Sequence, residues 1–262
     1  MTLLGVRELS RNFEGLTALE DVTFDVVAGG VHSIIGPNGA GKTTLFNLVT
    51  GLYRPTRGRV LLAGADVTGA QPSSLAARGL SRTFQNLQIF FNMTALENVM
   101  VGAHLHSDRR LSSALFRVRG LGRRERASAD RARALMTAVG LDAYARSTAA
   151  SMPYGALKRL EIARALASQP KLLLLDEPAA GLNLAETVEI GKLIREIAAS
   201  GVTVLLVEHN MRLVMEISDR VLVLDRGQLL ADGTADEVRA DPQVVRAYLG
   251  TRAAEARESL CA

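Results

Sequence analysis

Residues 36–43 read GPNGAGKT and combine closely spaced glycines with one lysine and one threonine. Glycines let a backbone approach an anion closely, so that successive N–H groups point toward phosphate oxygens. The spacing fits G-x-x-x-x-G-K-[ST], in which the lysine reaches the β- and γ-phosphates and the hydroxyl ligates Mg²⁺. The candidate ATP-binding residues are Gly36, Pro37, Asn38, Gly39, Ala40, Gly41, Lys42, Thr43 and Thr44, of which Lys42 is also a catalytic candidate and Thr43 a Mg²⁺ ligand.

The basic position of this motif is a lysine in a chain that has only 4 Lys beside 27 Arg. Lysine is a slim point charge, whereas arginine is a planar fork, and a loop wrapped around phosphates needs the slim cation. A glycine-rich turn formed by chance is the alternative. The lysine, placed between an apolar run and a helical pattern, favours a nucleotide-binding loop.

A second acidic motif, KLLLLDEP at residues 171–178, follows a continuous apolar run. In parallel α/β sheets, ligands bind beyond the carboxyl ends of the strands, where Asp176 and Glu177 would stand. Asp176 can hold Mg²⁺ through water, as this aspartate does in phosphate-loop NTPases. Glu177 can take a proton from the attacking water as a general base. Alone, the motif would more often be a turn; after a phosphate loop it predicts catalysis.

Short apolar runs bounded by turn residues predict strands buried on both faces. They occupy residues 31–35, 171–176, 202–207 and 220–225. Between two of these runs, one helix face is marked by Ile190, Leu193, Ile194 and Ile197. Strand–helix–strand order implies a parallel sheet covered by helices. The alternating segment 22–26 and the segment 59–62, followed by AGAD, predict an additional antiparallel layer.

The segment from about residue 96 to residue 149 is rich in Ala, Leu and Arg and predicts a helical insertion, with a helix over 124–139. Residues 101–150 hold ten Arg and four acidic residues, an excess of +6, whereas the whole chain is +4. This local charge excludes a uniformly basic nucleic-acid binder. The Arg-rich stretch 117–135 predicts a solvated helix face, with lipid headgroups or nucleic acid as alternatives.

Three remaining features have simple interpretations. His104 and His106 lack acidic or cysteine partners at ligand spacing, so we expect a loop rather than a metal site. The one cysteine, Cys261, permits no internal disulfide and suits a reducing compartment. The chain shows no signal pattern and no apolar run long enough to cross a bilayer, so we expect a soluble protein that could dock on a membrane protein.

In their order along nearly the whole chain, these motifs resemble the ATP-binding subunits of ABC transporters. Gln85 in SRTFQN matches the glutamine that touches Mg²⁺ or water and reports to the membrane partner. His209 in LLVEHNM matches the histidine that holds the γ-phosphate, which makes it a catalytic candidate. Phe13 in RNFEGLTAL stands where the family stacks an aromatic ring on adenine. Taken singly, Gln85, His209 and Phe13 could each be a solvated or core residue. Taken together, in this order around GPNGAGKTT and LLLLDEP, they favour the family assignment.

The turn SMPYGALKRLEIARAL at residues 151–166 aligns with the ABC signature, which faces the ATP of the partner subunit in a head-to-tail dimer. Its candidate residues are Pro153, Tyr154, Gly155 and Ala156. The usual serine hydroxyl and glutamine amide are absent, and Pro153 suits the first turn of a helix. The resemblance therefore implies a weakened trans contact and unequal ATP sites. Asn183 occupies a position where many members have aspartate.

Within this family, the chain resembles the LivG type of subunit from branched-chain amino acid uptake systems. The segments that carry this resemblance are PYG before KRLEIARAL, LLLLDEPAAGLN, RTFQNLQIF and RAYLG. The resemblance implies a RecA-like α/β core with an antiparallel β layer at 1–90 and 160–250, and an inserted helical subdomain at 91–159 that ends in the signature turn. Residues 251–262 are expected to form a C-terminal tail.

The implied function is ATP hydrolysis, with ATP and Mg²⁺, that drives an importer from the cytoplasmic face of the inner membrane. The implied partners are a second ATPase in a heterodimer, with a homodimer as the alternative, a permease pair and, indirectly, an external substrate-binding protein. No nucleic acid partner is expected. Alternatives are an ABC ATPase for urea, amide or lipopolysaccharide transport, or a soluble ABC ATPase that acts on ribosomes or DNA. The latter usually carry two cassettes or a long coiled-coil insertion, and this chain has neither.

Overall fold

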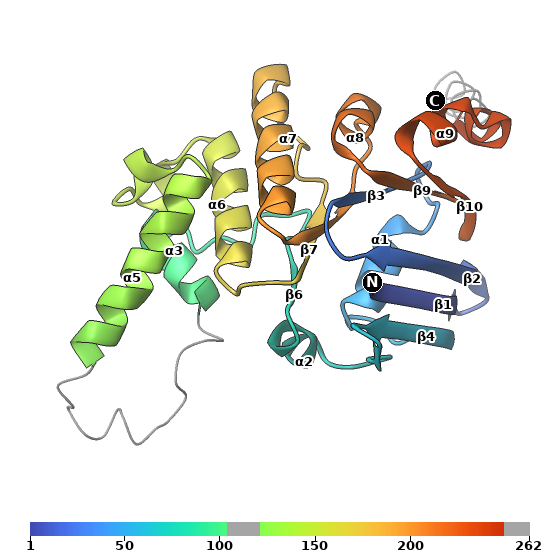
Figure 1. Ribbon diagram of the computed structural model, residues 1–262, viewed down its shortest axis with the longest axis horizontal. Helices are drawn as coiled ribbons and strands as arrows, with labels where there is room; N and C mark the ends of the chain where they lie inside the picture. Colours follow the sequence, from blue (N-terminus) through green and yellow to red (C-terminus); the bar gives the residue numbers. More distant parts are fainter. Residues whose placement is uncertain (104–120, 249–262) are drawn as a thin grey trace.

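The computed structural model describes residues 1–103 and 121–248, which form two β-sheets and the helices packed against them (Figure 1). One sheet is six-stranded and mostly parallel, and the other is four-stranded and antiparallel. The predicted α/β fold with an additional antiparallel layer is therefore confirmed.

The six-stranded sheet has the order β10-β9-β3-β8-β7-β6, and all neighbours are parallel except β10 and β9. Every residue of β3, β7 and β8 is buried, which explains their continuous apolar runs. The four predicted runs all lie in this sheet, which comprises β3 (Val31–Ile35), β6 (Leu80–Arg82), β7 (Leu172–Asp176), β8 (Thr203–Val207), β9 (Arg220–Asp225) and β10 (Gln228–Gly233).

The antiparallel sheet has the order β2-β1-β4-β5 and contains both strands predicted for this layer. Its strands are β1 (Thr2–Phe13), β2 (Leu16–Val27), β4 (Arg57–Leu62) and β5 (Ala65–Asp66). The sequence did not predict β1. Its register with β4 shifts between Arg7 and Ser10, and Glu8 has a φ of 46°, so the period-two alternation of apolar residues is interrupted.

Helix α1 (Lys42–Val49) packs between the two sheets, where it shares a hydrophobic cluster with both. Leu172 and Leu174 of β7 face this cluster, whereas Leu173 and Leu175 face the cluster on the opposite side of the sheet. This period of two is the geometry of a strand that is buried on both faces. The opposite side is covered by α6 (Tyr154–Leu166), α7 (Leu184–Ala199) and α8 (Met211–Ile217), while α9 (Ala235–Ala240) packs near β9 and β10.

A helical region lies at one end of the molecule, where α3, α5 and α6 gather (Figure 1). Its elements are α3 (Ala95–Gly102), α5 (Leu121–Ala138), the short 3-10 turns Asp142–Tyr144 and Ala149–Ser151, and the start of α6, whereas α2 (Pro72–Ala77) packs on β6 at the edge of the sheet. The helix predicted over 124–139 corresponds to α5. Arg126, Arg131 and Arg133 are exposed on it, so the role of the Arg-rich stretch stays a prediction, and residues 117–120 of that stretch lie outside the described residues.

The division into domains stays a prediction, and α6 runs without a break through the predicted boundary at 159–160. His104, His106, Cys261 and the tail 251–262 lie outside the described residues. Within the described ranges, no helix combines the length and the apolar character needed to span a bilayer.

Candidate functional site

The loop at residues 36–41 leaves the end of β3 and leads directly into α1, which begins at Lys42. Two of its glycines are sterically required. A Cβ on Gly36 would lie 2.1 Å from the carbonyl oxygen of Leu224, and one on Gly41 would lie 2.7 Å from Leu19 Cδ2. Gly39, at a φ of 78°, has no neighbour that a Cβ would meet, so its backbone angle alone favours glycine. The loop therefore packs closely on β2 and β9, with Gly39 on its open side.

Lys42 turns its ammonium group back into this loop. Its Nζ donates hydrogen bonds to the carbonyl oxygens of Gly36 at 2.6 Å and Pro37 at 2.9 Å. Partial burial lowers the pKa of Lys42, and the negative charge of Glu177 acts in the opposite direction. The structure thus holds a cation inside the loop at the N-terminus of a helix, which is where phosphate oxygens bind.

Two predicted catalytic residues, Glu177 and His209, and the predicted Mg²⁺ ligand Gln85 converge at the carboxyl end of β7. Gln85 Nε2 donates to Glu177 Oε2 at 3.3 Å, and His209 Nδ1 lies 3.8 Å from the same oxygen. Glu177 has a φ of 49°, a conformation that is strained for a residue with a side chain. Its amide donates to the carbonyl oxygen of Val207 at 2.9 Å, which holds this strained residue against β8. The geometry therefore fixes one carboxylate between an amide and an imidazole.

Asp176 has a partner that sequence reasoning missed. Arg82 Nη2 lies 2.8 Å from Asp176 Oδ2, and both side chains are buried. The amide of Asp176 also donates to Thr83 Oγ1 at 3.3 Å. Arg82 is the last residue of β6 and lies three residues before Gln85. The arginine was therefore visible in the SRTFQN segment, but one arginine among 27 did not stand out.

The predicted Mg²⁺ ligands Thr43, Gln85 and Asp176 supply a hydroxyl, an amide and a carboxylate, all hard oxygen donors. Across residues 1–103 and 121–248, no group of three or more His, Cys, Asp or Glu side chains could hold a metal by itself. Mg²⁺ in nucleotide sites usually takes one or two protein ligands and fills the rest of its octahedron with phosphates and water. The donor set fits a cation of that kind, and the ligand assignment stays a prediction.

Glu208 is a second residue that the sequence did not reveal. Its side chain is fully buried. Oε1 accepts the amide of Ala179 at 2.9 Å, while Oε2 accepts the amides of His209 at 3.0 Å and Asn210 at 3.1 Å. One carboxylate therefore joins the loop after Glu177 to the loop that carries His209.

We predict that Glu208→Gln lowers both stability and turnover. An NH₂ group in place of one oxygen would face backbone N–H donors, and an unsatisfied buried donor costs about 1–3 kcal/mol. In a chain of this size, that loss lowers the melting temperature by roughly 2–12 °C. We expect kcat to fall about tenfold with KM for ATP nearly unchanged, because the two loops lose their common anchor. Thermal unfolding and ATPase assays would measure stability and turnover, with Glu216→Gln at an exposed carboxylate as the control. Equal behaviour of the two variants would contradict the role of Glu208 as the common anchor of the two loops.

Phe13 lies at the end of β1 in a small cluster of rings. Its ring contacts Tyr53 edge-on, with centroids 5.5 Å apart, and the guanidinium of Arg11 lies 4.4 Å from its centroid. The hairpin that it belongs to continues into Ala18 and Leu19, which pack against Gly41 of the phosphate loop. Phe13 is thus half-buried near the loop, and its contact with adenine stays a prediction.

Phe13→Ala is expected to weaken ATP binding by about tenfold, because stacking of a base on an aromatic ring contributes about 1–3 kcal/mol. Phe13→Tyr should restore the wild-type affinity. A titration with a fluorescent ATP analogue measures both constants, and Phe91→Ala, which removes an exposed ring on the loop before α3, serves as the control. An unchanged dissociation constant in Phe13→Ala would exclude the stacking role.

The predicted signature turn begins α6 and packs against the start of α7. Pro153 is the N-cap of α6, one position before the first helical residue, so it precedes the first turn instead of lying within it. A Cβ on Gly155 would meet Glu186 Oε1 at 2.6 Å, and one on Gly181 would meet the Tyr154 ring at 3.0 Å. The turn therefore contacts the loop that follows Glu177, while α6 and α1 lie well apart (Figure 1). Its contact with a partner's ATP stays a prediction.

Asn183 is the N-cap of α7. Its side chain accepts the amide of Glu186 at 3.0 Å, and Glu186 accepts the amide of Asn183 at 3.0 Å. This capping box stabilises the start of the helix. The loop between Glu177 and α7 is thereby fixed at both ends.

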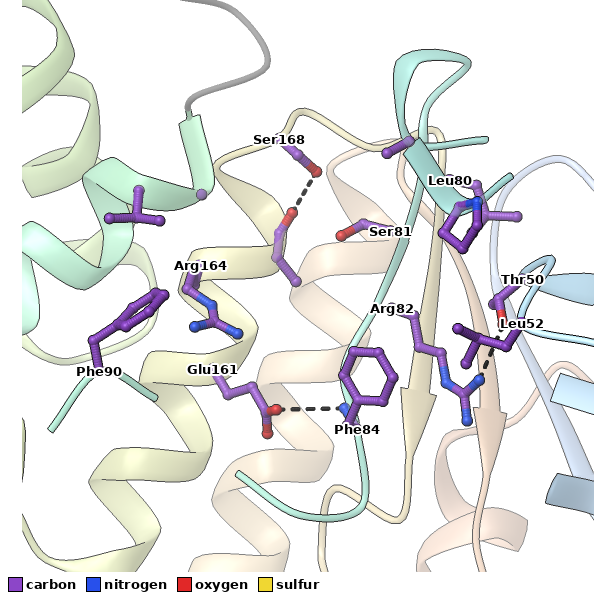
Figure 2. Close-up of a pocket in the computed structure, with 15 residues that line it drawn as sticks. Thr50, Leu52, Leu80, Ser81, Arg82, Phe84, Phe90, Glu161, Arg164 and Ser168 are labelled. Carbon is purple, nitrogen blue, oxygen red and sulfur yellow. Dashed lines mark hydrogen bonds between the residues drawn. The ribbon is translucent and has the colours of Figure 1, made fainter. Parts of the chain in front are cut away.

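An apolar groove of about 390 Å³ opens beside the loop that carries Gln85 (Figure 2). It lies between the helical region and the sheet, and its floor and walls come from β6, α2, α3, α6 and the end of α1. Four of its apolar side chains are exposed, namely Leu52, Phe84, Phe90 and Val101. Two charged residues, Glu161 and Arg164, line it from α6. The groove is an exposed apolar surface, and Phe84, which lines it, directly precedes Gln85 in the sequence.

Comparison with known proteins identifies the family of this chain. Residues 19–180 match the family model described as ABC transporter, and residues 228–254 match the model described as branched-chain amino acid ATP-binding cassette transporter. The chain is 44% identical over 249 residues to the high-affinity branched-chain amino acid transport ATP-binding protein BraF of Pseudomonas aeruginosa. It is 43% identical over 249 residues to LivG of Escherichia coli. Each match covers 95% of this chain and 98% of the relative.

Solved structures agree with the sequence relatives. A nucleotide-free ATP-binding cassette from an ABC transporter superposes with a TM-score of 0.83 at 32% identity, over 95% of this chain and 99% of that one. The ADP conformation of an ATP-binding cassette has a TM-score of 0.83 at 33% identity, with the same coverage. The family match, the fold and the near-complete coverage agree, and the chain belongs to the family of ABC transporter ATP-binding proteins.

Proposed function

We propose that this chain is the ATP-hydrolysing subunit of an ABC importer for branched-chain amino acids. The site supports hydrolysis because Glu177, Gln85 and His209 meet at one carboxylate oxygen, with the Lys42 cation in the adjoining loop. The substrate class is supported by identities of 43–44% to LivG and BraF over 95% of this chain.

In the proposed reaction, Lys42 and the loop amides bind the β- and γ-phosphates, and Glu177 accepts a proton as water attacks the γ-phosphorus. The bond to the β,γ-bridging oxygen breaks, and ADP and phosphate leave. His209 lies close enough to Glu177 to contact the same water or the γ-phosphate. Thr43, Gln85 and, through water, Asp176 would hold Mg²⁺, whose positive charge would stabilise the phosphates. Catalysis thus rests on positioning and charge stabilisation.

The transporter would need partners that this chain does not supply. We place a second ATPase against the signature turn formed by Pro153, Tyr154, Gly155 and Ala156, in a heterodimer, with a homodimer as the alternative. We place a permease pair at the groove beside Gln85, where an apolar segment of a membrane protein would cover Phe84 and Phe90. The protein would then work at the cytoplasmic face of the inner membrane, and an external binding protein would deliver the substrate to the permeases.

Transport of urea, an amide or lipopolysaccharide would use the same chemistry, because the transported molecule does not touch this subunit. The match of residues 228–254 to the branched-chain family model favours amino acids over these alternatives. A soluble ABC ATPase that acts on ribosomes or DNA is less well supported, because the match to single-cassette transport subunits covers 98% of each relative.

Capture of partners tests the proposal. Glu177→Gln protein loaded with ATP would be incubated with detergent-solubilised native membranes, and the retained proteins identified. We expect a permease pair and a second ATPase with an ordinary signature sequence, and we expect Lys42→Met protein to retain less of the second ATPase. Recovery of ribosomes or of soluble partners alone would overturn the transport assignment while leaving the ATPase chemistry intact.

A further inference from the structure

Arg82 connects the groove with the buried carboxylate of Asp176. Its guanidinium pairs with Asp176 Oδ2 at 2.8 Å through Nη2. Through Nη1 it also donates to Asn47 Oδ1 at 2.7 Å and to Thr50 Oγ1 at 3.0 Å. Asn47 and Thr50 lie at the end of α1, the helix that begins with Lys42. One side chain therefore holds both the acidic end of β7 and the helix of the phosphate loop.

The same guanidinium also contacts the groove. It lies 5.1 Å from the ring centroid of Phe84 and 5.4 Å from that of the buried Phe46. Phe84 is 37% exposed and lines the groove (Figure 2). The carboxylate of Glu161 on α6 accepts the amides of Phe84 at 3.3 Å and Gln88 at 3.4 Å, so α6 holds both sides of the loop that carries Gln85. A displacement of Phe84 would therefore act directly on the Arg82 guanidinium.

We propose that Arg82 is a positioning residue that orients Asp176 for Mg²⁺ and transmits the position of Phe84 to the nucleotide site. The second half rests on the proposed function, because it requires a permease segment in the groove. Arg82 suits the role because its planar fork binds three oxygen acceptors at once while its guanidinium lies over the ring of Phe84. A lysine at this position would keep the charge but could not hold these partners in one plane.

A purely structural role is the alternative, because breaking a buried ion pair destabilises a protein whatever the function of its partners. The two roles differ in what else changes. Groups that orient a metal ligand typically alter metal affinity by about 10- to 100-fold when they are replaced. A structural role would lower the melting temperature without altering Mg²⁺ affinity or the response to the permease.

The test uses Arg82→Lys, with Arg78→Met at an exposed arginine as the control. ADP affinity would be measured with a fluorescent analogue in EDTA and then across a Mg²⁺ titration. We expect Arg82→Lys to bind ADP in EDTA as the wild type does, but to need about tenfold more Mg²⁺ for half-maximal effect. Unchanged Mg²⁺ dependence in a folded Arg82→Lys protein would overturn the proposal, and so would an equal change in the control.

A second variant, Phe84→Ala, changes an exposed ring and leaves the ion pair between Arg82 and Asp176 in place. In the isolated subunit, we expect its Mg²⁺ dependence to match the wild type. In the complex with the permease pair, we expect it to lose most of the stimulation of ATPase activity that the permeases give the wild type. If the permeases stimulate the ATPase activity of Phe84→Ala as fully as that of the wild type, the proposed link between the groove and Arg82 would be overturned. If the wild type itself shows no stimulation, the proposed function fails, and the Mg²⁺ titration still decides the role of Arg82 toward Asp176.

Discussion

Replacement of Glu177 by glutamine is expected to reduce ATP turnover by about 10²- to 10⁴-fold, the contribution usual for a general base. The substitution preserves the size of the side chain, and the new amide oxygen can still accept the hydrogen bond from Gln85 Nε2 that Glu177 accepts at 3.3 Å. What is lost is the basic oxygen that takes the proton of the attacking water. ATP binding should stay within about twofold of the wild type, because Lys42 and the loop amides are unaffected.

Single-turnover hydrolysis and equilibrium ATP binding would be measured side by side. Glu189→Gln is the matched control, because it makes the same chemical change on an exposed carboxylate of α7. Hydrolysis at more than one tenth of the wild-type rate in Glu177→Gln would remove Glu177 from the role of general base. His209 Nδ1, 3.8 Å from Glu177 Oε2, would then be the next residue to test.

Replacement of Lys42 by methionine is expected to weaken ATP binding and to lower kcat by about 10²- to 10³-fold. Loss of a hydrogen bond to a charged group costs about 1.5–3 kcal/mol, which corresponds to roughly 10- to 150-fold in the dissociation constant. The loss of kcat is that expected when a cation is removed from developing phosphate charge. Methionine fills a similar volume, so the helix that begins at residue 42 should still form.

The control for this variant is Lys192→Met, which removes an exposed lysine that pairs with Glu189 at 3.5 Å on the surface of α7. Surface pairs of this kind contribute at most about 1 kcal/mol, so stability and activity should change little. Calorimetric titration with ATP and steady-state hydrolysis would measure both variants. Wild-type affinity in Lys42→Met would show that the loop binds phosphate without its lysine and would contradict the assigned role.

Much of the fold was predictable because its signals are local. The buried strands that frame the site are continuous apolar runs, and α7 carries an apolar stripe behind its capping residue Asn183. The phosphate loop could be recognised because Gly36 and Gly41 allow close approaches that no other residue permits. In contrast, β1 was missed because a register shift and the left-handed Glu8 interrupt its alternation.

The supporting residues of the site were not predictable for a different reason. Arg82 meets Asp176 across 94 residues of sequence, and Glu208 meets Ala179 across 29. Such contacts depend on which strands lie side by side, and the sequence does not show that β6 pairs with β7 and β8 with β7. A charged residue inside an apolar context is the signal that was present: Glu208 directly follows the buried strand β8. The exact place of Pro153, at the N-cap of α6, also required the structure.

We expect ATP hydrolysis by this chain to drive the uptake of branched-chain amino acids. The most direct measurement is uptake of labelled leucine into proteoliposomes that contain the captured permease pair, the second ATPase and this chain, with the external binding protein added. We predict uptake that requires ATP and is lost when Glu177→Gln replaces the wild-type chain. Hydrolysis of ATP without uptake of leucine, isoleucine or valine, or equal uptake with Glu177→Gln, would show that ATP hydrolysis by this chain does not drive this transport.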